Sequence, residues 1–176
     1  MENVSKIKWT TLFIFVLSAI AFAQDKDTWE KRDIKNEWGD ITGITYMQHL
    51  IGEGISKTFN DGEPWNIFLQ WDGGKSDTLF MPIAVNVLDS YVAPVATFKD
   101  EKVSISLRNS KGDIKNFQGV FKEKGSNSGS MLVICKNKQL VELLKKDESF
   151  MILIKSTSSA NSWQVRAEVK GNLPSQ

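Results

Sequence analysis

The residues best suited to nucleophilic chemistry are a serine in a glycine-rich pentapeptide and the only histidine of the chain. Residues 125–129 have the pattern G-x-S-x-G, which in hydrolases places a nucleophilic serine on a sharp turn between a buried strand and a helix. Here the charged residues Glu123 and Lys124 precede the pattern, and an apolar strand follows it. The histidine, His49, lies upstream, whereas the hydrolase order places the histidine last. We therefore interpret the pentapeptide as a flexible hairpin loop.

The single cysteine does not supply a better nucleophile. Cys135 ends the apolar run 131–135, which is typical of a buried strand, and burial opposes formation of the reactive thiolate. We expect His49 to lie with Thr45 and Met47 on the wetter face of another strand, as a surface or cross-strand polar residue. One cysteine also excludes an intramolecular disulfide.

Metal binding and hydrolysis receive little support from the remaining residue types. One His and one Cys cannot supply the three or four nitrogen and sulfur ligands of a zinc site. Calcium stays open as an alternative through Asp61 with Glu63, or Asp72 with Asp77, although neither stretch has the spacing of a calcium-binding loop. The carboxylate pair of a glycan hydrolase cannot be recognised from spacing, because its separation is set by the fold. We predict no catalytic residue, no metal and no cofactor.

Tryptophan is the residue type that stands out. Trp65, Trp71 and Trp163 alternate in phase with aliphatic neighbours, so we assign them to the core. Trp29 and Trp38 lie in the irregular N-terminal segment. Their flat aromatic faces could stack on a sugar ring or anchor a protein partner, and packing over the end of the core is the competing interpretation for both.

The heptapeptide around Trp38 is the most distinctive short segment. It reads Glu-Trp-Gly-Asp-Ile-Thr-Gly over residues 37–43. Gly39 and Gly43 would let the chain turn sharply, and Asp40 and Thr42 could hydrogen-bond to local backbone. A structural role for Asp40 and Thr42 is our first interpretation, and a contact with a ligand or partner is the second.

This heptapeptide resembles a stretch in small exported bacterial proteins of uncharacterised function, which read E-[FW]-G-D-x-T-G near the mature N-terminus. The later order is similar too, with a helix like 138–146, a strand like 150–155 and a last strand like 163–169. The chain is also more faintly similar to the invasion-associated locus B proteins and to accessory proteins of type VI secretion. The resemblance implies a β-sandwich without known catalytic residues, over most of the mature chain.

Strands must position these residues, because the hydrophobic period along the chain is mostly two. Apolar and polar side chains alternate most clearly in three segments: 65–71, 102–109 and 162–170. Other predicted strands are 44–50, 55–59, 79–88, 96–99, 114–121, 131–135 and 150–155. Pro82 should place its strand at an edge or a bulge, or start it one residue later. Between the strands, residues 60–62, 72–74 and 111–113 have turn compositions.

About ten short strands separated by turns favour an all-β fold. We predict an antiparallel β-sandwich, with a barrel as the alternative. One segment differs: residues 137–147 have leucines at helical spacing and Asn137 as an N-cap, so we predict a short helix that closes one end or edge of the sheets.

The N-terminus predicts export. Lys6 and Lys8 precede an apolar run that ends in Ala-Phe-Ala at residues 21–23, the pattern of a cleavable signal peptide. The run is shorter than the ~20 residues of a membrane-spanning helix, although an uncleaved anchor is the alternative. Because no cysteine lies near the end of the run, we do not expect a lipoprotein. We predict a signal peptide at 1–23, a charged tether or short surface helix at 24–36, one β-rich domain at 37–171 and a tail at 172–176.

Composition narrows the classes of function. The formal net charge of +1 over 176 residues lacks the basic surface that nucleic acid demands. We predict a periplasmic or secreted, non-enzymatic β-sandwich that binds another macromolecule of the cell envelope, with no transmembrane segment after signal cleavage. The alternatives are a carbohydrate-binding module that uses Trp29 or Trp38, and a carboxylate-dependent glycan hydrolase.

Overall fold

The computed structural model describes residues 28–56, 64–73, 77–87, 90–92, 100–122, 130–157 and 162–174. Five sequence predictions lie outside these ranges: the signal peptide, the G-x-S-x-G pentapeptide, the turn at 60–62, the Asp61–Glu63 pair and the strand at 96–99. Because a strand rather than a helix follows the pentapeptide, the context required for a nucleophilic serine is not met.

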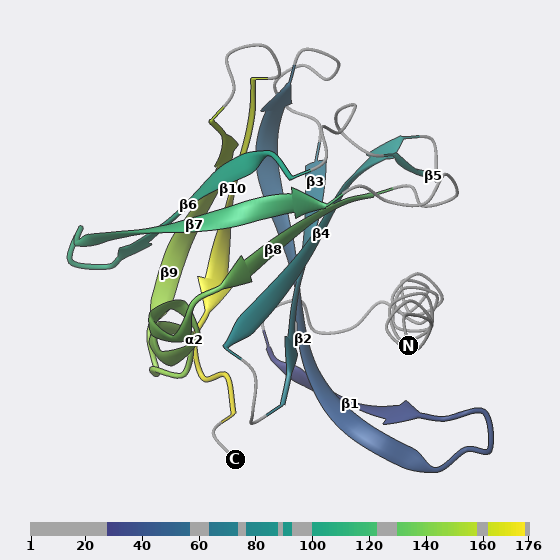
Figure 1. Ribbon diagram of the computed structural model, residues 1–176. Helices are drawn as coiled ribbons and strands as arrows, with labels where there is room; N and C mark the ends of the chain where they lie inside the picture. Colours follow the sequence, from purple (N-terminus) through teal and green to yellow (C-terminus); the bar gives the residue numbers. More distant parts are fainter. Residues whose placement is uncertain are drawn as a thin grey trace.

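The described segments form a closed antiparallel barrel rather than a sandwich. The elements are β1 (Glu30–Lys35), β2 (Ile41–Ser56), β3 (Pro64–Asp72), β4 (Thr78–Val87), β5 (Ser90–Val92), β6 (Lys102–Asn109), β7 (Ile114–Lys122), β8 (Met131–Lys136), α2 (Lys138–Leu144), β9 (Ser149–Ser156) and β10 (Trp163–Lys170). Eight strands pair in the order β2-β10-β9-β6-β7-β8-β4-β3, and β3 pairs again with β2 (Figure 1). β1 and β5 pair with β2 and β4 outside this ring. The predicted sandwich is wrong, and the barrel alternative is confirmed.

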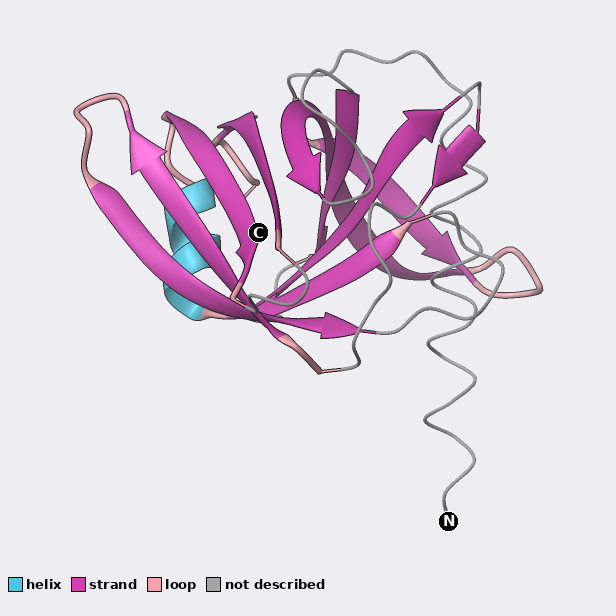
Figure 2. Cartoon of the chain, turned by 90° about the horizontal axis from the view of Figure 1, so that it is seen from above, coloured by secondary structure: helices cyan, strands magenta, loops and turns pink. Residues whose placement is uncertain are grey.

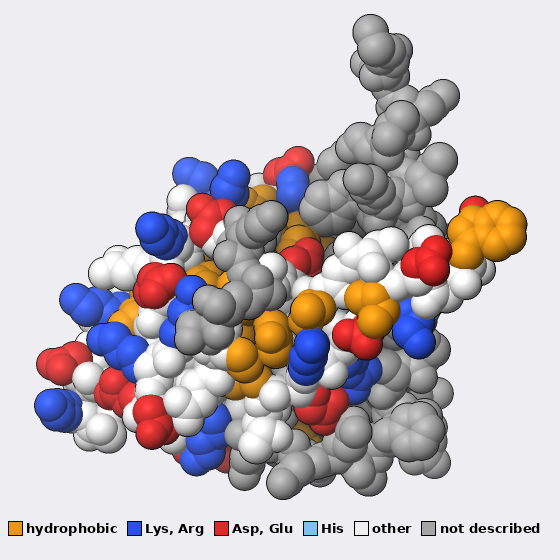
Figure 3. All heavy atoms as spheres, turned by 90° about the horizontal axis from the view of Figure 1, so that it is seen from below, with side chains coloured by type: hydrophobic (Ala, Val, Ile, Leu, Met, Phe, Trp, Pro, Cys, Tyr) orange, Lys and Arg blue, Asp and Glu red, His pale blue; other side chains and the backbone are white. Residues whose placement is uncertain are grey.

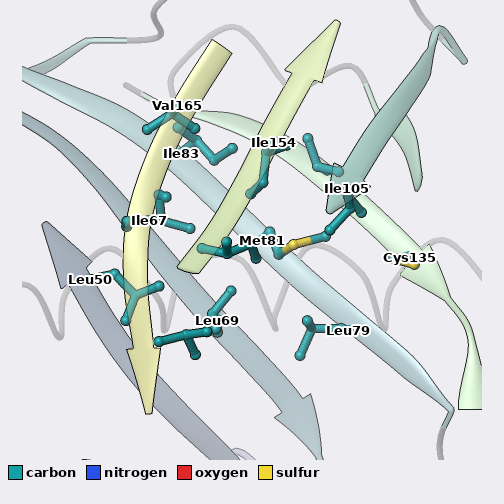
Figure 4. Close-up of a cluster of buried hydrophobic side chains, with 14 of the residues drawn as sticks. Leu50, Ile67, Leu69, Leu79, Met81, Ile83, Ile105, Cys135, Ile154 and Val165 are labelled. Atoms are coloured by element: carbon teal, nitrogen blue, oxygen red, sulfur yellow. The ribbon is translucent and has the colours of Figure 1, made fainter. Parts of the chain in front are cut away.

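The barrel interior is filled by the apolar side chains that alternate along the strands. Ile67, Ile83, Ile105, Ile154 and Val165 come from five different strands and face a common centre (Figure 4). All five are fully buried. The predicted strands at 65–71, 102–109 and 162–170 are confirmed as β3, β6 and β10. Trp65, Trp71 and Trp163 are core residues, as predicted.

The predicted helix is confirmed and closes one end of the barrel. The side chain of Asn137 accepts a hydrogen bond from the backbone N–H of Leu140 at 3.1 Å, which is the expected N-cap. Leu140, Val141 and Leu144 are buried in the core cluster. Figure 1 shows the helix at the lower end of β8 and β9, and seen from above it lies beneath the strands in one half of the ring (Figure 2).

β2 is one continuous strand of 16 residues, whereas the sequence predicted separate strands at 44–50 and 55–59. The glycines between the two predicted strands do not break the chain; they allow close packing. A Cβ on Gly52 would lie 2.4 Å from the carbonyl oxygen of Arg166, and one on Gly54 would lie 2.1 Å from Cδ2 of Trp65. Only glycine lets β2 pass this close to β10 and to the indole of Trp65.

Pro82 lies in the middle of an interior strand, so its predicted position at an edge, a bulge or a strand start is wrong. β4 is paired with β3 on one side and with β8 on the other. The β4–β8 register is continuous through the Pro82–Leu132 pair. The β3–β4 register has no pair at Met81 or Pro82, between the pairs Ile67–Ile83 and Gln70–Phe80. The sheet tolerates proline here because one ladder is interrupted locally on the side where the ring replaces the N–H.

Both ends of the predicted domain are better ordered than the sequence suggests. Residues 30–35 of the expected tether form β1, which pairs with β2. In the expected tail, Leu173 is buried and its N–H donates to Leu144 at 2.9 Å. A Cβ on Gly171 would lie 1.9 Å from the carbonyl oxygen of Lys146, so only glycine fits where the chain turns onto α2.

Candidate functional site

The β1–β2 hairpin ends in a tight turn, which we call the Trp38 tip (residues 36–41). Asn36 organises it: its Oδ1 accepts hydrogen bonds from the backbone N–H groups of Trp38 and Asp40, both at 2.9 Å. Its Nδ2 donates to the carboxylate of Asp40 at 3.1 Å. Gly39 has φ +88°, the left-handed conformation that favours glycine. Side chain and backbone together therefore fix the shape of this tip.

A second hairpin, between β6 and β7, repeats the same turn; we call it the Lys111 tip (residues 109–114). Oδ1 of Asn109 accepts from the N–H groups of Lys111 at 3.1 Å and Asp113 at 2.8 Å, and Nδ2 of Asn109 donates to the Asp113 carboxylate at 3.1 Å. Gly112 has φ +90°. The backbone hydrogen bonds also match: each asparagine N–H donates to the carbonyl of its aspartate, and each glycine N–H donates to the carbonyl of its asparagine.

The sequence carries a signal for this repeat that the motif analysis missed. The Trp38 tip reads Asn-Glu-Trp-Gly-Asp-Ile and the Lys111 tip reads Asn-Ser-Lys-Gly-Asp-Ile. Asparagine, glycine and aspartate, which build the turn, are identical in both, and only the second and third positions differ. Trp38 therefore occupies a position where the same turn forms with lysine.

Trp38 is almost fully exposed to solvent, so its side chain does not contribute to the packing of the core. Its side chain is 82% exposed, and Ile41 beside it is 61% exposed. The hairpin projects from the barrel in Figure 1, and seen from below this side of the molecule ends in hydrophobic atoms (Figure 3). Since Lys111 shows that the turn does not need an aromatic residue, the indole is available for a contact outside the chain.

Asp40 and Thr42 both form hydrogen bonds within the hairpin, but neither side chain bonds to the backbone of its own turn as the sequence suggested. The Asp40 carboxylate accepts from the Asn36 side chain, and Asn36 is the residue that forms the Asx-turn. The hydroxyl of Thr42 donates to the carbonyl of Ile34 across the hairpin at 3.1 Å. Gly43, predicted to turn the chain, lies within β2 opposite Ile34.

Trp29 lies at the opposite end of β1 from the Trp38 tip. It is half-buried against the core, and its indole N–H donates to the carbonyl of Lys170 at 2.9 Å. β1 has six residues, so at about 3.3 Å per residue the two tryptophans are separated by about 20 Å. The structure does not bring Trp29 and Trp38 together on one binding face.

His49 and Cys135 lie on opposite sides of the barrel wall. His49 lies on the outer side of β2, with its Nε2 2.8 Å from Oδ1 of Asn66 and its ring stacked on Phe68. It is the predicted cross-strand polar residue, but the face is not wet, since Thr45 and Met47 are each only 6% exposed. Cys135 points inward and its thiol donates to the carbonyl of Gln118 at 3.4 Å. Burial raises the pKa of this thiol to about 11.

Asp72, which the sequence left open as a calcium ligand, is the described carboxyl with a clearly raised pKa. Burial raises its pKa, and a hydrogen bond with the Thr45 side chain opposes the rise. Among the described residues, no group of three or more His, Cys, Asp or Glu side chains is arranged to hold a metal ion. In the same ranges no helix is long and apolar enough to cross a bilayer.

Comparison with known proteins gave no match to a family model, to a curated protein or to a solved structure. The candidate site therefore rests on the geometry of the chain itself, and the resemblance noted for residues 37–43 stays a prediction.

Proposed function

We propose that this chain is an exported, non-enzymatic binding module of the cell envelope, and that the Trp38 tip contacts a protein partner. The observation that carries the proposal is the exposure of Trp38 on a turn that the Lys111 tip builds equally well without an aromatic residue. Exposed aromatic anchors surrounded by polar residues dominate the binding energy of many protein interfaces.

The turn's rigidity supports this role. The Asn36 side chain and Gly39 hold the backbone of the tip in one conformation, so little conformational entropy would be lost when a partner binds. Trp38 and Ile41 offer apolar surface, and the carboxylates of Glu37 and Asp40 lie beside them. The partner surface that complements this tip is an apolar pocket with a polar rim.

The two alternative functions have weaker support. A carbohydrate-binding module would gain from two aromatic faces in one groove, yet Trp29 uses its N–H inside the chain and lies a whole strand away from Trp38. A glycan hydrolase would need two carboxyl groups about 5–10 Å apart; Asp72, the described carboxyl with a raised pKa, gains that shift from burial in the wall of the barrel.

The experiment compares the wild-type protein with the double variant Glu37→Ser and Trp38→Lys, which gives the Trp38 tip the residues of the Lys111 tip. Both immobilised proteins are incubated with a solubilised envelope fraction and, separately, with a glycan array. We expect the wild type to retain a discrete protein that the double variant loses, and neither to bind glycans. Equal retention by both, or Trp38-dependent binding of a glycan, would contradict the proposal.

The matched control is the double variant Ser110→Glu and Lys111→Trp, which gives the Lys111 tip the residues of the Trp38 tip. Its Trp38 tip is intact, so it should retain the same protein as the wild type. Because both variants use residues that the same turn already accommodates, their near-ultraviolet circular dichroism spectra should show intact folding.

A further inference from the structure

The Trp38 tip presents an aromatic side chain between negative charges. Glu37 and Asp40 flank Trp38 on the turn, and all three are exposed. No lysine or arginine occurs within residues 36–41, and the exposed Lys35, at the position that matches Arg108, adjoins the tip, so residues 35–42 carry two negative charges and one positive charge. A cation that approached this tip would meet two carboxylates and the face of an indole, and both attract cations.

The Lys111 tip presents the opposite charge on the same backbone. Arg108, Lys111 and Lys115 are exposed around the turn, against the single carboxylate of Asp113. In the described part of the chain none of these three cations forms an ion pair. Ile114 next to them is 57% exposed, so this tip also combines charge with apolar surface.

The two tips project from opposite sides of the barrel. Figure 1 shows the β1–β2 hairpin and the β6–β7 hairpin pointing away from each other, and the view from above agrees (Figure 2). The tips of one molecule therefore cannot meet each other. Complementary surfaces on opposite sides of a molecule form heterologous, head-to-tail contacts between copies.

We propose that the Trp38 tip of one copy binds the Lys111 tip of a second copy. Lys111 and its neighbouring cations face Trp38 and the two carboxylates, and Ile114 lies against the apolar side of the Trp38 tip. This inference rests on the proposed function, because it uses the same tip, and it identifies the protein partner as a second copy of this chain.

The small size of the tips determines the strength of the contact. Two hairpin turns bury far less than the ~1,000 Å² of a stable interface, so association is weak and appears at high protein concentration. Since the charges are solvent-exposed, salt screens them, with a Debye length of ~10 Å at 0.1 M and ~3 Å at 1 M. Because each copy keeps one open tip of each kind, the average mass rises steadily with concentration instead of stopping at a dimer.

The test uses sedimentation velocity of the protein at low ionic strength with two variants, each blocked at one tip. One variant carries Glu37→Ser and Trp38→Ser, and the other carries Lys111→Glu and Lys115→Glu. We expect the wild type to gain mass with concentration and to lose that gain in ~1 M salt, where exposed charges are screened. Each variant alone stays monomeric, and an equimolar mixture forms dimers and nothing larger, because it holds one intact tip of each kind.

Three outcomes would overturn the inference. These are a wild type that stays monomeric at every concentration, a mixture that stays monomeric although the wild type assembles, and assembly of the Lys111→Glu, Lys115→Glu variant alone. The last result would mean that two Trp38 tips contact each other. Retention of a different envelope protein through Trp38 by a strictly monomeric wild type would refute this inference while leaving the proposed function standing.

Discussion

The indole N–H of Trp29 donates a hydrogen bond to the carbonyl oxygen of Lys170, 141 residues away along the chain, at 2.9 Å. This bond joins the segment before β1 to the last residue of β10. The N-terminal half of β10 pairs with β2 from Ser56 to Glu53. On the same side of β2, β1 pairs from Met47 to Ile41. Trp29 therefore spans the place where β2 changes partners.

Replacing Trp29 by Phe should destabilise the fold modestly. The ring would keep most of its packing, but the carbonyl of Lys170 would lose its donor, at a cost of about 1 kcal/mol. Urea unfolding followed by far-ultraviolet circular dichroism measures the change. Trp38→Phe serves as the control and should leave the free energy of unfolding unchanged, because Trp38 is 82% exposed. Equal effects of the two substitutions would contradict the role assigned to Trp29.

Replacing Gly54 by Ala should destabilise the protein more than replacing Gly39 by Ala. At Gly54 the new Cβ would lie 2.1 Å from Cδ2 of Trp65, so the indole or β2 must move, at about 1–3 kcal/mol or more. At Gly39 nothing lies within 4 Å of the new Cβ, and only the left-handed backbone costs energy, about 1–2 kcal/mol. Thermal unfolding of both variants ranks them, and a Gly54→Ala variant as stable as the wild type would show that β2 does not pass this close to Trp65.

Asp72→Asn should gain stability over the wild type as the pH rises. The folded-state pKa of Asp72 lies above the ordinary 3.8 because of burial. Between the two pKa values the folded protein holds a proton that the unfolded chain has released, so stability falls as the pH rises through this window. Asparagine cannot ionise and escapes that loss. The difference in melting temperature, variant minus wild type, should therefore be larger at neutral pH than near pH 3.8; a difference that does not vary with pH would contradict the burial of this carboxyl.

The thiol of Cys135 should be almost unreactive in the folded protein. Burial raises its pKa from 9.0 to about 11, which lowers the thiolate fraction about a hundredfold, since each pKa unit is a factor of ten. Labelling with Ellman's reagent at pH 8 should be at least that much slower in buffer than in denaturant. Rapid labelling under native conditions would show that the end of β8 opens to solvent.

Local patterns in the sequence predicted the strands well, because alternation of apolar and polar side chains is a property of each segment alone. Closure of the barrel depends on pairs distant in sequence, such as Trp163 with Ser56 and Thr45 with Asp72. No single segment encodes those pairs, so the same strands fitted a sandwich equally well. The alternation of apolar and polar residues therefore could not decide between a sandwich and a barrel.

Two segments were misread for opposite reasons. β1 carries charged side chains at both faces and has one paired edge, so it lacks the apolar alternation that identifies a strand, and its charges suit an exposed edge. Gly52 and Gly54 suggested a break in β2, although their role is to leave room for Arg166 and Trp65. Glycine signals either a turn or a close approach, and only the neighbouring strand decides between them.

The candidate site was located by residue type but not by its organising residue. Tryptophan composition drew attention to Trp38, and the turn signal at Gly39 was correct. The contribution of Asn36 and the matching turn at 109–114 emerged only from the hydrogen bonds of the two hairpins. Comparing the two hairpins shows that asparagine, glycine and aspartate build the turn, and that the turn does not require Trp38.

A photo-crosslinking amino acid at position 38, introduced in intact cells that produce the protein, tests the proposed contact most directly, with a second version labelled at the exposed Gln164 on the barrel wall. We expect a discrete protein adduct from position 38 and none of the same mass from position 164. No adduct at position 38, or the same adduct from both positions, would contradict the claim that this tip is the binding element of the molecule.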